Sequence, residues 1–288
     1  MPARRLLAVP IVCLSLLTAC NKPPAEVSTA APAAESPKAT QPNLGSRVSP
    51  EMKAAAAKII AAARQDEQGW SRLTALCDRV GNRFAGTPGL EHAIEWALAD
   101  WAKDGLDDVR REAVMVKHWK RGAESLQLMQ PNGPRPMAML GLGNSPGTPA
   151  GGITAPVVVV RDFDHLAALG DAVRGKIVLF NFPMKTKDNT FEAYGEAVQY
   201  RWKGPVEASK AGALAALVRS VTTRSLRTPH TGSTKLIDPV EDNTNPIPAA
   251  AVSIEDAETL QRLSDAGVTP VVTLSMAAQR LPDVSSAN

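Results

Sequence analysis

The chain has 288 residues, of which 44% are hydrophobic and 21% are charged, a composition typical of a soluble globular protein. Its net charge is only +3, and its lysines and arginines are scattered instead of gathered in a basic tract, which argues against a nucleic-acid partner. The length predicts about two compact units.

The first twenty residues have the pattern of a bacterial lipoprotein signal. A basic start, Arg4 and Arg5, precedes the apolar run Leu6–Leu17, which is too short to span a bilayer as a mature helix. The run leads into Leu17-Thr18-Ala19-Cys20, and cleavage before the cysteine would release residues 1–19. Several acyl chains on Cys20 would then hold the protein at a membrane. An ordinary secretory signal with a chance cysteine is the alternative.

Residues 20–48 predict a disordered tether, because they are rich in Pro, Ala, Ser and Thr and contain few large apolar residues. With Cys13 in the signal and Cys20 lipidated, Cys77 is the one cysteine left, so no internal disulfide is expected. Cys77 shares an apolar helical stripe with Leu73 and Val80, which favours a buried structural thiol. These features predict an exported protein anchored in the cell envelope, on the periplasmic side of the outer membrane in a Gram-negative host.

Residues 49–136 predict helices followed by strands. Ser49 is suited to cap a helix that has Pro50 in its first turn. The other expected elements are helices over 70–80 and 87–105 and strands over 109–118 and 124–130. Residues 130–134, Gln-Pro-Asn-Gly-Pro, break the strand pattern and are interpreted as the end of this unit.

Residues 137–281 alternate strand and helix signals and predict a small α/β domain. Short apolar runs over 157–160 and 176–180 suit strands that are buried in a sheet. The other expected elements are a helix over 194–212, an apolar run over 213–218, a helix between Ser253 and Gly267, and a last strand over 270–277.

No catalytic or metal-binding set can be assigned from residue patterns. Gly143–Gly147 matches the G-x-S-x-G pattern of serine hydrolases, but Pro146 excludes the helix that must follow the nucleophile, so a loop is favoured. His92 and Glu95 could meet on a helix, yet two ligands do not make a zinc site. The acidic segment 162–165 is interpreted as a turn in which Asp164 caps a helix.

The polar loop 224–232 is the strongest candidate for function. It gathers two arginines, one histidine and several hydroxyl groups where neither a helix nor a strand pattern holds. Such loops often carry function, although solvated loops without a function are commoner.

A series of short segments between about Arg72 and the end of the chain keeps a characteristic order. They are 78–83, 86–91, 117–122, 140–143, 147–149, 175–178, 196–201, 225 with 229–232, 247–250 and 254–258. Together they resemble the N-terminal half of the carboxypeptidase Q-like zinc metallopeptidases, relatives of bacterial aminopeptidases and of glutamate carboxypeptidase. No single segment is diagnostic, but their order over about 200 residues is specific.

The resemblance implies an α/β fold in two parts. Residues 49–136 would be the N-terminal helices and first strands of a peptidase domain, incomplete here, and residues 137–281 an inserted protease-associated domain with a small mixed sheet and helices. In the family, the residues that hold two zinc ions follow this insertion, and the zinc activates water for attack on a peptide bond. Residues 282–288 would begin the return to that catalytic part. We therefore expect zinc in the complete parent enzyme, and neither bound zinc nor catalytic or metal-ligating residues in this chain.

The resemblance also implies a function. The chain would be the N-terminal portion of an exported zinc metallo-exopeptidase, of carboxypeptidase or dipeptidase type, that hydrolyses peptides or dipeptides, and it would be inactive without the catalytic part. His230, with Tyr200 and Arg201, would lie near the outer end of the substrate, where a guanidinium can hold a carboxylate. A standalone lipid-anchored binding module and a degenerate structural protein are the alternatives, and a homodimer is left open.

The two-part arrangement also predicts which residues fold independently. Residues 137–281 should fold independently, because they contain their own strands, helices and caps. Residues 68–130 should not, because the sheet partners of their strands would lie beyond Asn288.

Replacing Cys20 by serine tests the anchor. Because the thiol is the expected site of lipid attachment, the Cys20→Ser protein should move from the membrane fraction to the soluble fraction of the cell envelope. Fractionation followed by immunodetection measures this change. Continued sedimentation of the variant with membranes would contradict the predicted lipid anchor.

Overall fold

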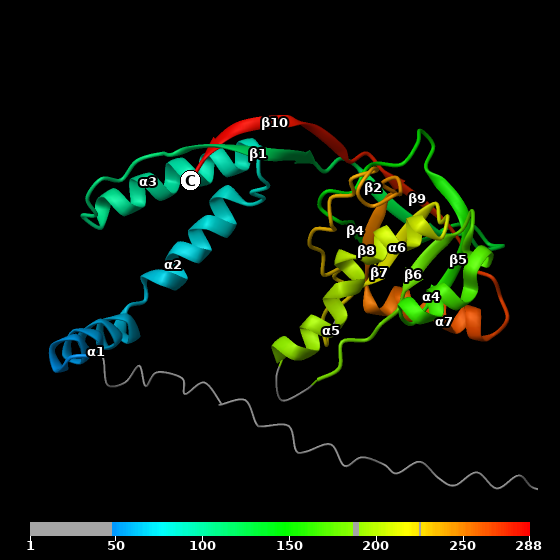
Figure 1. Cartoon of the computed structure of the whole chain (residues 1–288), viewed down its shortest axis with the longest axis horizontal. Coiled ribbons are helices and arrows are strands. Elements are labelled where there is room, and N and C mark those ends of the chain that lie inside the picture. The colour runs from blue at the N-terminus through cyan, green and yellow to red at the C-terminus, as the bar shows by residue number, and fades with distance from the viewer. Residues whose placement is uncertain (1–47, 187–189, 225) are drawn as a thin grey trace, which may run out of the picture. The chain divides into compact units, whose positions relative to one another are not determined.

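The computed structural model describes residues 48–186, 190–224 and 226–288 (Figure 1). The predicted signal, Cys20 and nearly all of the predicted tether lie outside these residues. The chain divides into two compact units, Met1–Asp66 and Glu67–Asn288. In the described part, none of the helices combines the length and the apolar character that crossing a membrane requires.

In the first unit, the described structure is the helix α1, Pro50–Gln65. The Ser49 hydroxyl accepts a hydrogen bond from the backbone nitrogen of Met52 at 3.2 Å, and Pro50 occupies the first turn. This bond satisfies one of the free amides at the helix start, so the predicted cap is confirmed.

The second unit begins with helices. Helix α2, Gln68–Ala75, continues into the single π-helical turn η2, Leu76–Val80, and α3 covers Pro88–Lys103. Arg72 joins α2 to α3 through ion pairs with Asp100 at 2.7 Å and Asp104 at 2.6 Å. The predicted burial of Cys77 is wrong. Its side chain is exposed, and Leu73 on the same stripe is 50% exposed, because α2 meets α3 through these charged groups instead.

A two-stranded ribbon follows. Strands β1, Ala113–Lys120, and β10, Gln279–Ala287, pair antiparallel, with Val114 opposite Ser286. Helix α3 contacts this ribbon, since Glu91 accepts a hydrogen bond from the Ser286 hydroxyl at 2.8 Å. Residues 282–288, expected to begin a return to another part of the fold, therefore already serve as the partner of β1 within this chain. The expectation that β1 would find its partner beyond Asn288 is corrected by this pairing.

An eight-stranded mixed sheet makes up the remainder, in the order β3-β2-β9-β5-β6-β7-β8-β4. The strands are β2 Glu124–Leu128, β3 Arg135–Met137, β4 Met139–Gly141, β5 Ile153–Val160, β6 Ile177–Phe180, β7 Ala215–Arg219, β8 Ala249–Val252 and β9 Val271–Met276. Strands β5 to β8 run parallel, and the other pairs are antiparallel. The end strands β3 and β4 are separated only by Ala138, so one continuous stretch of chain pairs with β2 and then with β8 and thereby closes the sheet.

The sheet starts earlier than the sequence indicated. Strand β2 pairs with β9, with Glu124 opposite Met276, and with β3, with Leu126 opposite Met137. The segment 130–134 is thus a hairpin connection, closed by a bond from Gly133 nitrogen to Gln130 oxygen at 3.0 Å, and not a break between units. The predicted boundary between 136 and 137 falls inside β3, because turn-forming residues mark hairpins and domain ends alike.

Helices pack on the sheet in two groups (Figure 1). Helix α7, Ile254–Asp265, packs through Ala257 and Leu260 on one side of the parallel strands. On the other side lie three helices and one 3₁₀ turn: α4 (Phe163–Leu169), the turn η3 (Gly170–Val173), α5 (Thr190–Trp202) and α6 (Gly204–Lys210). Alternate residues of β6 pack into different cores. Ile177 and Leu179 belong to the core under α7, whereas Val178 and Phe180 belong to the core on the other side. Burial on both faces explains why these strands are continuous apolar runs.

Two helix boundaries differ from the prediction. The single helix expected over 194–212 is broken at Lys203, because Pro205 lacks an amide hydrogen and its ring disfavours helical geometry before it. Gly204 lets the second helix approach the sheet, since a Cβ there would lie 2.9 Å from the Phe180 ring. Helix α4 is capped by Asp162, which accepts from the His165 nitrogen at 2.7 Å, and not by Asp164.

The buried carboxylate of Asp256 lies where the sheet closes. It is 0% exposed and accepts hydrogen bonds from the Ala138 nitrogen at 2.7 Å and the Ser253 hydroxyl at 3.0 Å. Arg135 and Arg227 pair with the same carboxylate at 3.0 and 3.4 Å. One side chain thus ties the β3–β4 junction, the start of α7 and the loop at 227 together.

Replacing Asp256 by alanine should destabilise the second unit by about 2–3 kcal/mol, because the half-buried Ala138 amide would lose its partner. The lost ion pairs with Arg135 and Arg227 contribute less to this destabilisation, because these side chains are 41% and 53% exposed and water can solvate them. Urea unfolding followed by circular dichroism measures the change. Asp265→Ala, at an exposed position of the same helix, is the matched control. Equal midpoints for the two variants would contradict the proposed role of Asp256.

Candidate functional site

A pocket of about 280 Å³ lies beyond the carboxyl ends of the parallel strands β6 and β7. Its lining residues come from three places, the segment after β6, the segment after β7, and helix α5 with the polar loop. They are Met184, Lys185, Thr186, Ala193, Tyr194, Val221, Thr222, Thr223 and His230. The carboxyl end of parallel strands is the usual ligand-binding edge of an α/β sheet, because loops and helix ends meet there.

Arg201 is not among the lining residues, but it orients the lining residue Tyr194. Its Nη2 donates to the Tyr194 hydroxyl at 2.8 Å, and its guanidinium lies 5.7 Å from the Tyr194 ring centre. Nη1 donates to the carbonyl oxygen of Thr231 at 3.4 Å. Tyr194 and Arg201 are seven residues apart on α5, about two helical turns, so both lie on one face of the helix.

His230 lies next to Tyr194 in the lining of the pocket. Its ring meets that of Tyr194 edge to face, with centres 6.3 Å apart, and its backbone nitrogen donates to the Ser220 hydroxyl at 2.9 Å. Burial, and secondarily the positive charge of Arg201, lowers the pKa of His230 below its ordinary value of 6.5. The imidazole is therefore neutral at pH 7, with one nitrogen able to donate and the other able to accept a hydrogen bond.

The polar loop that carries His230 is fixed at its C-terminal end, to the end of strand β4 and the residues that follow it. The Thr231 hydroxyl donates to the carbonyl oxygen of Gly141 at 3.0 Å, and the Gly143 nitrogen donates to that of Gly232 at 2.8 Å. Gly232 also admits Arg201, because a Cβ there would lie 2.6 Å from the guanidinium carbon. The described part of the loop is thus positioned by hydrogen bonds and close packing, as a binding site requires.

Tyr200 lies elsewhere, although the sequence analysis grouped it with Arg201 and His230. It is 5% exposed and packs among Phe163, Phe180 and Phe182, with ring centres 4.7–5.8 Å away. Burial, helped by the charges of Asp162 and Asp164, raises the pKa of its phenol. Adjacent residues on a helix point about 100° apart, so Tyr200 enters the core while Arg201 reaches Tyr194.

Tyr194 is the site residue that sequence reasoning missed. The seven-residue spacing from Arg201 was a usable signal, because it predicts two side chains on the same helix face. Lys185, Thr222 and Thr223 were not identifiable, since they come together only through the order of strands β6 and β7 in the sheet.

The G-x-S-x-G segment is structural. Ser145 is 0% exposed, and its hydroxyl donates to the Pro146 carbonyl oxygen at 2.9 Å while accepting from the Ala249 nitrogen at 2.8 Å. Its carbonyl accepts from the Trp119 indole at 2.7 Å. These bonds anchor the ribbon strand β1 to strand β8, and they explain the buried serine without a nucleophilic role.

The residues described do not fit a zinc site. Across 48–186, 190–224 and 226–288, no group of three or more histidine, cysteine, aspartate or glutamate side chains is placed to hold a metal ion. No metal chemistry is therefore derived from these side chains.

The chain was compared with known proteins. No family model matches it. Over 225 residues it is 43% identical to carboxypeptidase Q of Bos taurus and 41% identical to that of Homo sapiens, a match covering 78% of this chain and 45% of each relative. Over these residues the chain is similar to the carboxypeptidase Q-like zinc metallopeptidases. This confirms the resemblance seen in the sequence. The chain spans less than half the length of these carboxypeptidase Q relatives.

A solved structure agrees with this family. The crystal structure of a peptidase M28 precursor from Shewanella amazonensis SB2B superposes with a TM-score of 0.74 at 28% identity, covering 81% of this chain and 52% of that one. The predicted α/β class is confirmed.

The lowered pKa of His230 makes a pH prediction. In the unfolded chain the imidazole binds a proton near pH 6.5, whereas in the folded chain it does so only at lower pH. The unfolded state therefore binds more protons in this window, and the free energy of unfolding should fall as the pH drops below about 6.5. Urea unfolding at pH 7.5 and 5.5 measures this slope.

The His230→Gln variant should lose part of that slope, because it removes the titrating group. His92→Gln, at an exposed position on α3, is the matched control and should keep the slope of the native chain. An identical pH dependence in the native chain and the His230→Gln variant would contradict the assignment.

Proposed function

We propose that this chain is part of a zinc-dependent metallo-exopeptidase of carboxypeptidase or dipeptidase type. The supporting observation is its 41–43% identity to carboxypeptidase Q over 225 residues. Peptides or dipeptides are the proposed substrates. The zinc ions, two in the proposal, would be held by residues other than those described, because no described cluster fits a metal.

The contribution of this chain to the enzyme is proposed to be substrate recognition. The closed sheet of β2 to β9 with its helices is the proposed protease-associated domain, and its pocket at Tyr194 and His230 is the proposed contact with the outer end of the peptide. Arg201 holds Tyr194 in place and adds positive potential, and Lys185 at the rim adds a second cation. This charge suits a carboxylate, and the small volume suits one or two residues of a peptide.

The proposed location is outside the cytoplasm. The signal-like segment 1–19 and Cys20 support export and lipid anchoring in the cell envelope.

A second candidate is a lipid-anchored binding module without catalysis. The closed sheet supports it, because both of its hydrophobic cores are built from the chain's own strands and helices and one pocket is already formed.

Expression with and without the neighbouring coding sequence tests the peptidase proposal. The chain alone, and the chain together with the reading frame that follows it in its genome, are assayed for hydrolysis of unblocked dipeptides. Chelator-sensitive hydrolysis is expected only for the combination, because the metal ligands are proposed to lie outside the described residues. Chelator-sensitive turnover by the chain alone would refute that placement, and no turnover in either would refute the peptidase.

In the active enzyme, His230→Ala should raise KM while the melting temperature changes little, because the imidazole contacts the substrate and not the core. A several-fold increase, of about tenfold at most, is expected for one lost hydrogen bond to a charged group. Tyr200→Phe is the matched control, and its KM should equal that of the native enzyme. A lower melting temperature with an unchanged KM in His230→Ala would show a structural role.

A further inference from the structure

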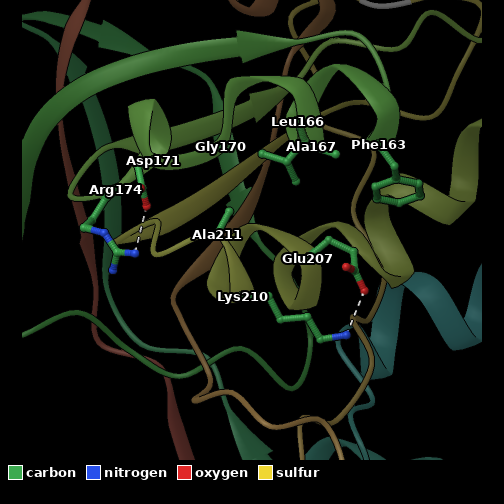
Figure 2. Close-up of a pocket in the computed structure, with 9 residues that line it drawn as sticks. All are labelled: Phe163, Leu166, Ala167, Gly170, Asp171, Arg174, Glu207, Lys210 and Ala211. Atoms are coloured by element: carbon green, nitrogen blue, oxygen red, sulfur yellow. Dashed lines mark hydrogen bonds and ion pairs between the residues drawn. The ribbon is translucent and has the colours of Figure 1, made fainter.

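A second and larger cavity lies on the side of the sheet that α4, α5 and α6 cover. Its volume is about 450 Å³, and it opens between α4 with η3 on one side and α6 on the other (Figure 2). Its apolar lining comes from Phe163, Leu166, Ala167 and Ala211. This volume is in the range of sites that hold small molecules.

The charged side chains of this cavity form two ion pairs. Arg174 Nη2 meets Asp171 Oδ1 at 3.0 Å, and Lys210 Nζ meets Glu207 Oε1 at 3.1 Å. Figure 2 shows the two pairs on different sides of the cavity, with Ala211 between them and the apolar side chains of α4 above. Each wall therefore offers one cation and one anion.

These pairs can be exchanged for ligand contacts at low cost. Both join residues three apart in the sequence, and their side chains are 40–91% exposed. Exposed pairs of this kind contribute little to stability, because water screens them and long side chains lose entropy. A ligand that presents opposite charges to the two walls can thus replace them without disturbing the fold.

One cation is held in position by the fold. Arg174 passes over Gly212, where a Cβ would lie 3.1 Å from Nη1 and 3.3 Å from Cγ. The Gly212 backbone has a positive φ of 83°, which glycine adopts without strain. The absence of a side chain at this position leaves room for the guanidinium beside the cavity.

We propose that this cavity is a binding site for a short peptide of about two residues with free termini, separate from the pocket at His230. A free amino acid carries both charges on one carbon, whereas the ends of a dipeptide are up to about 7 Å apart and can face opposite walls. The terminal carboxylate pairs with Arg174 or Lys210, the terminal ammonium with the acid on the other wall, and an apolar side chain covers Phe163 and Leu166. The site requires neither zinc nor hydrolysis, so it is independent of the proposed function.

Isothermal titration calorimetry of the whole chain with L-alanyl-L-leucine tests the site. The unblocked dipeptide should bind, and its N-acetyl and C-amide forms should each bind about tenfold more weakly, because each loses one charge-assisted contact. Ala167→Leu should abolish this binding by filling the cavity. Ala168→Leu, at the next exposed position of α4 and outside the cavity lining, is the matched control and should bind as the native chain does.

Two further variants locate the binding. Arg174→Gln with Lys210→Gln removes both cations and should weaken binding about tenfold, whereas Arg262→Gln with Lys120→Gln removes two exposed positive charges elsewhere and should not. His230→Ala should leave this binding event intact. Absence of binding to the native chain, equal affinity for the blocked dipeptides, or loss of all binding in His230→Ala would each overturn the proposal.

Discussion

The closure of the sheet at Asp256 is the constraint on which the second unit depends. Strands β3 and β4 are one stretch of chain that pairs with β2 before Ala138 and with β8 after it. A bend of this kind leaves backbone groups without strand partners, and the Asp256 carboxylate accepts the freed Ala138 amide. The Ser253 nitrogen donates to the Ala138 oxygen at 3.0 Å, so both polar groups of the bend are satisfied from the start of α7. A buried carboxylate here is stable because several donors surround it.

The two proposed binding sites lie away from the core that α7 closes, one on the other side of the parallel strands and one at the strand ends. The pocket at His230 uses the carboxyl ends of β6 and β7, whereas the cavity at Arg174 uses the gap between α4 and α6. The aromatic cluster around Tyr200 joins the two regions, since Phe163 lines the cavity and Tyr200 precedes Arg201. A rigid core therefore separates the two proposed sites.

The ribbon of β1 and β10 is attached to this sheet by polar bonds as well as by apolar packing. Arg121 donates to Gly141 oxygen at 2.7 Å, pairs with Glu124 at 3.1 Å, and covers the Trp119 ring at 5.0 Å. Arg280 donates to the carbonyl oxygen of Asn144 at 2.7 Å, and burial lowers the pKa of its guanidinium. The ribbon is therefore bonded to the same segment, Gly141–Asn144, that holds the polar loop at Thr231 and Gly232.

The sequence by itself determined the features that depend on neighbouring residues. It located the caps at Ser49 and Ser253, the apolar strands β6 and β7, and the loop character of Ser145, because capping bonds, strand composition and proline act within a few residues. The resemblance to the carboxypeptidase Q-like family also came from the sequence, through the order of short segments. The tertiary structure alone decided the closed sheet, the pairing of β1 with β10, and the separation of Tyr200 from His230. These depend on contacts between distant segments, such as Arg135 with Asp256, 121 residues apart, which no local pattern encodes.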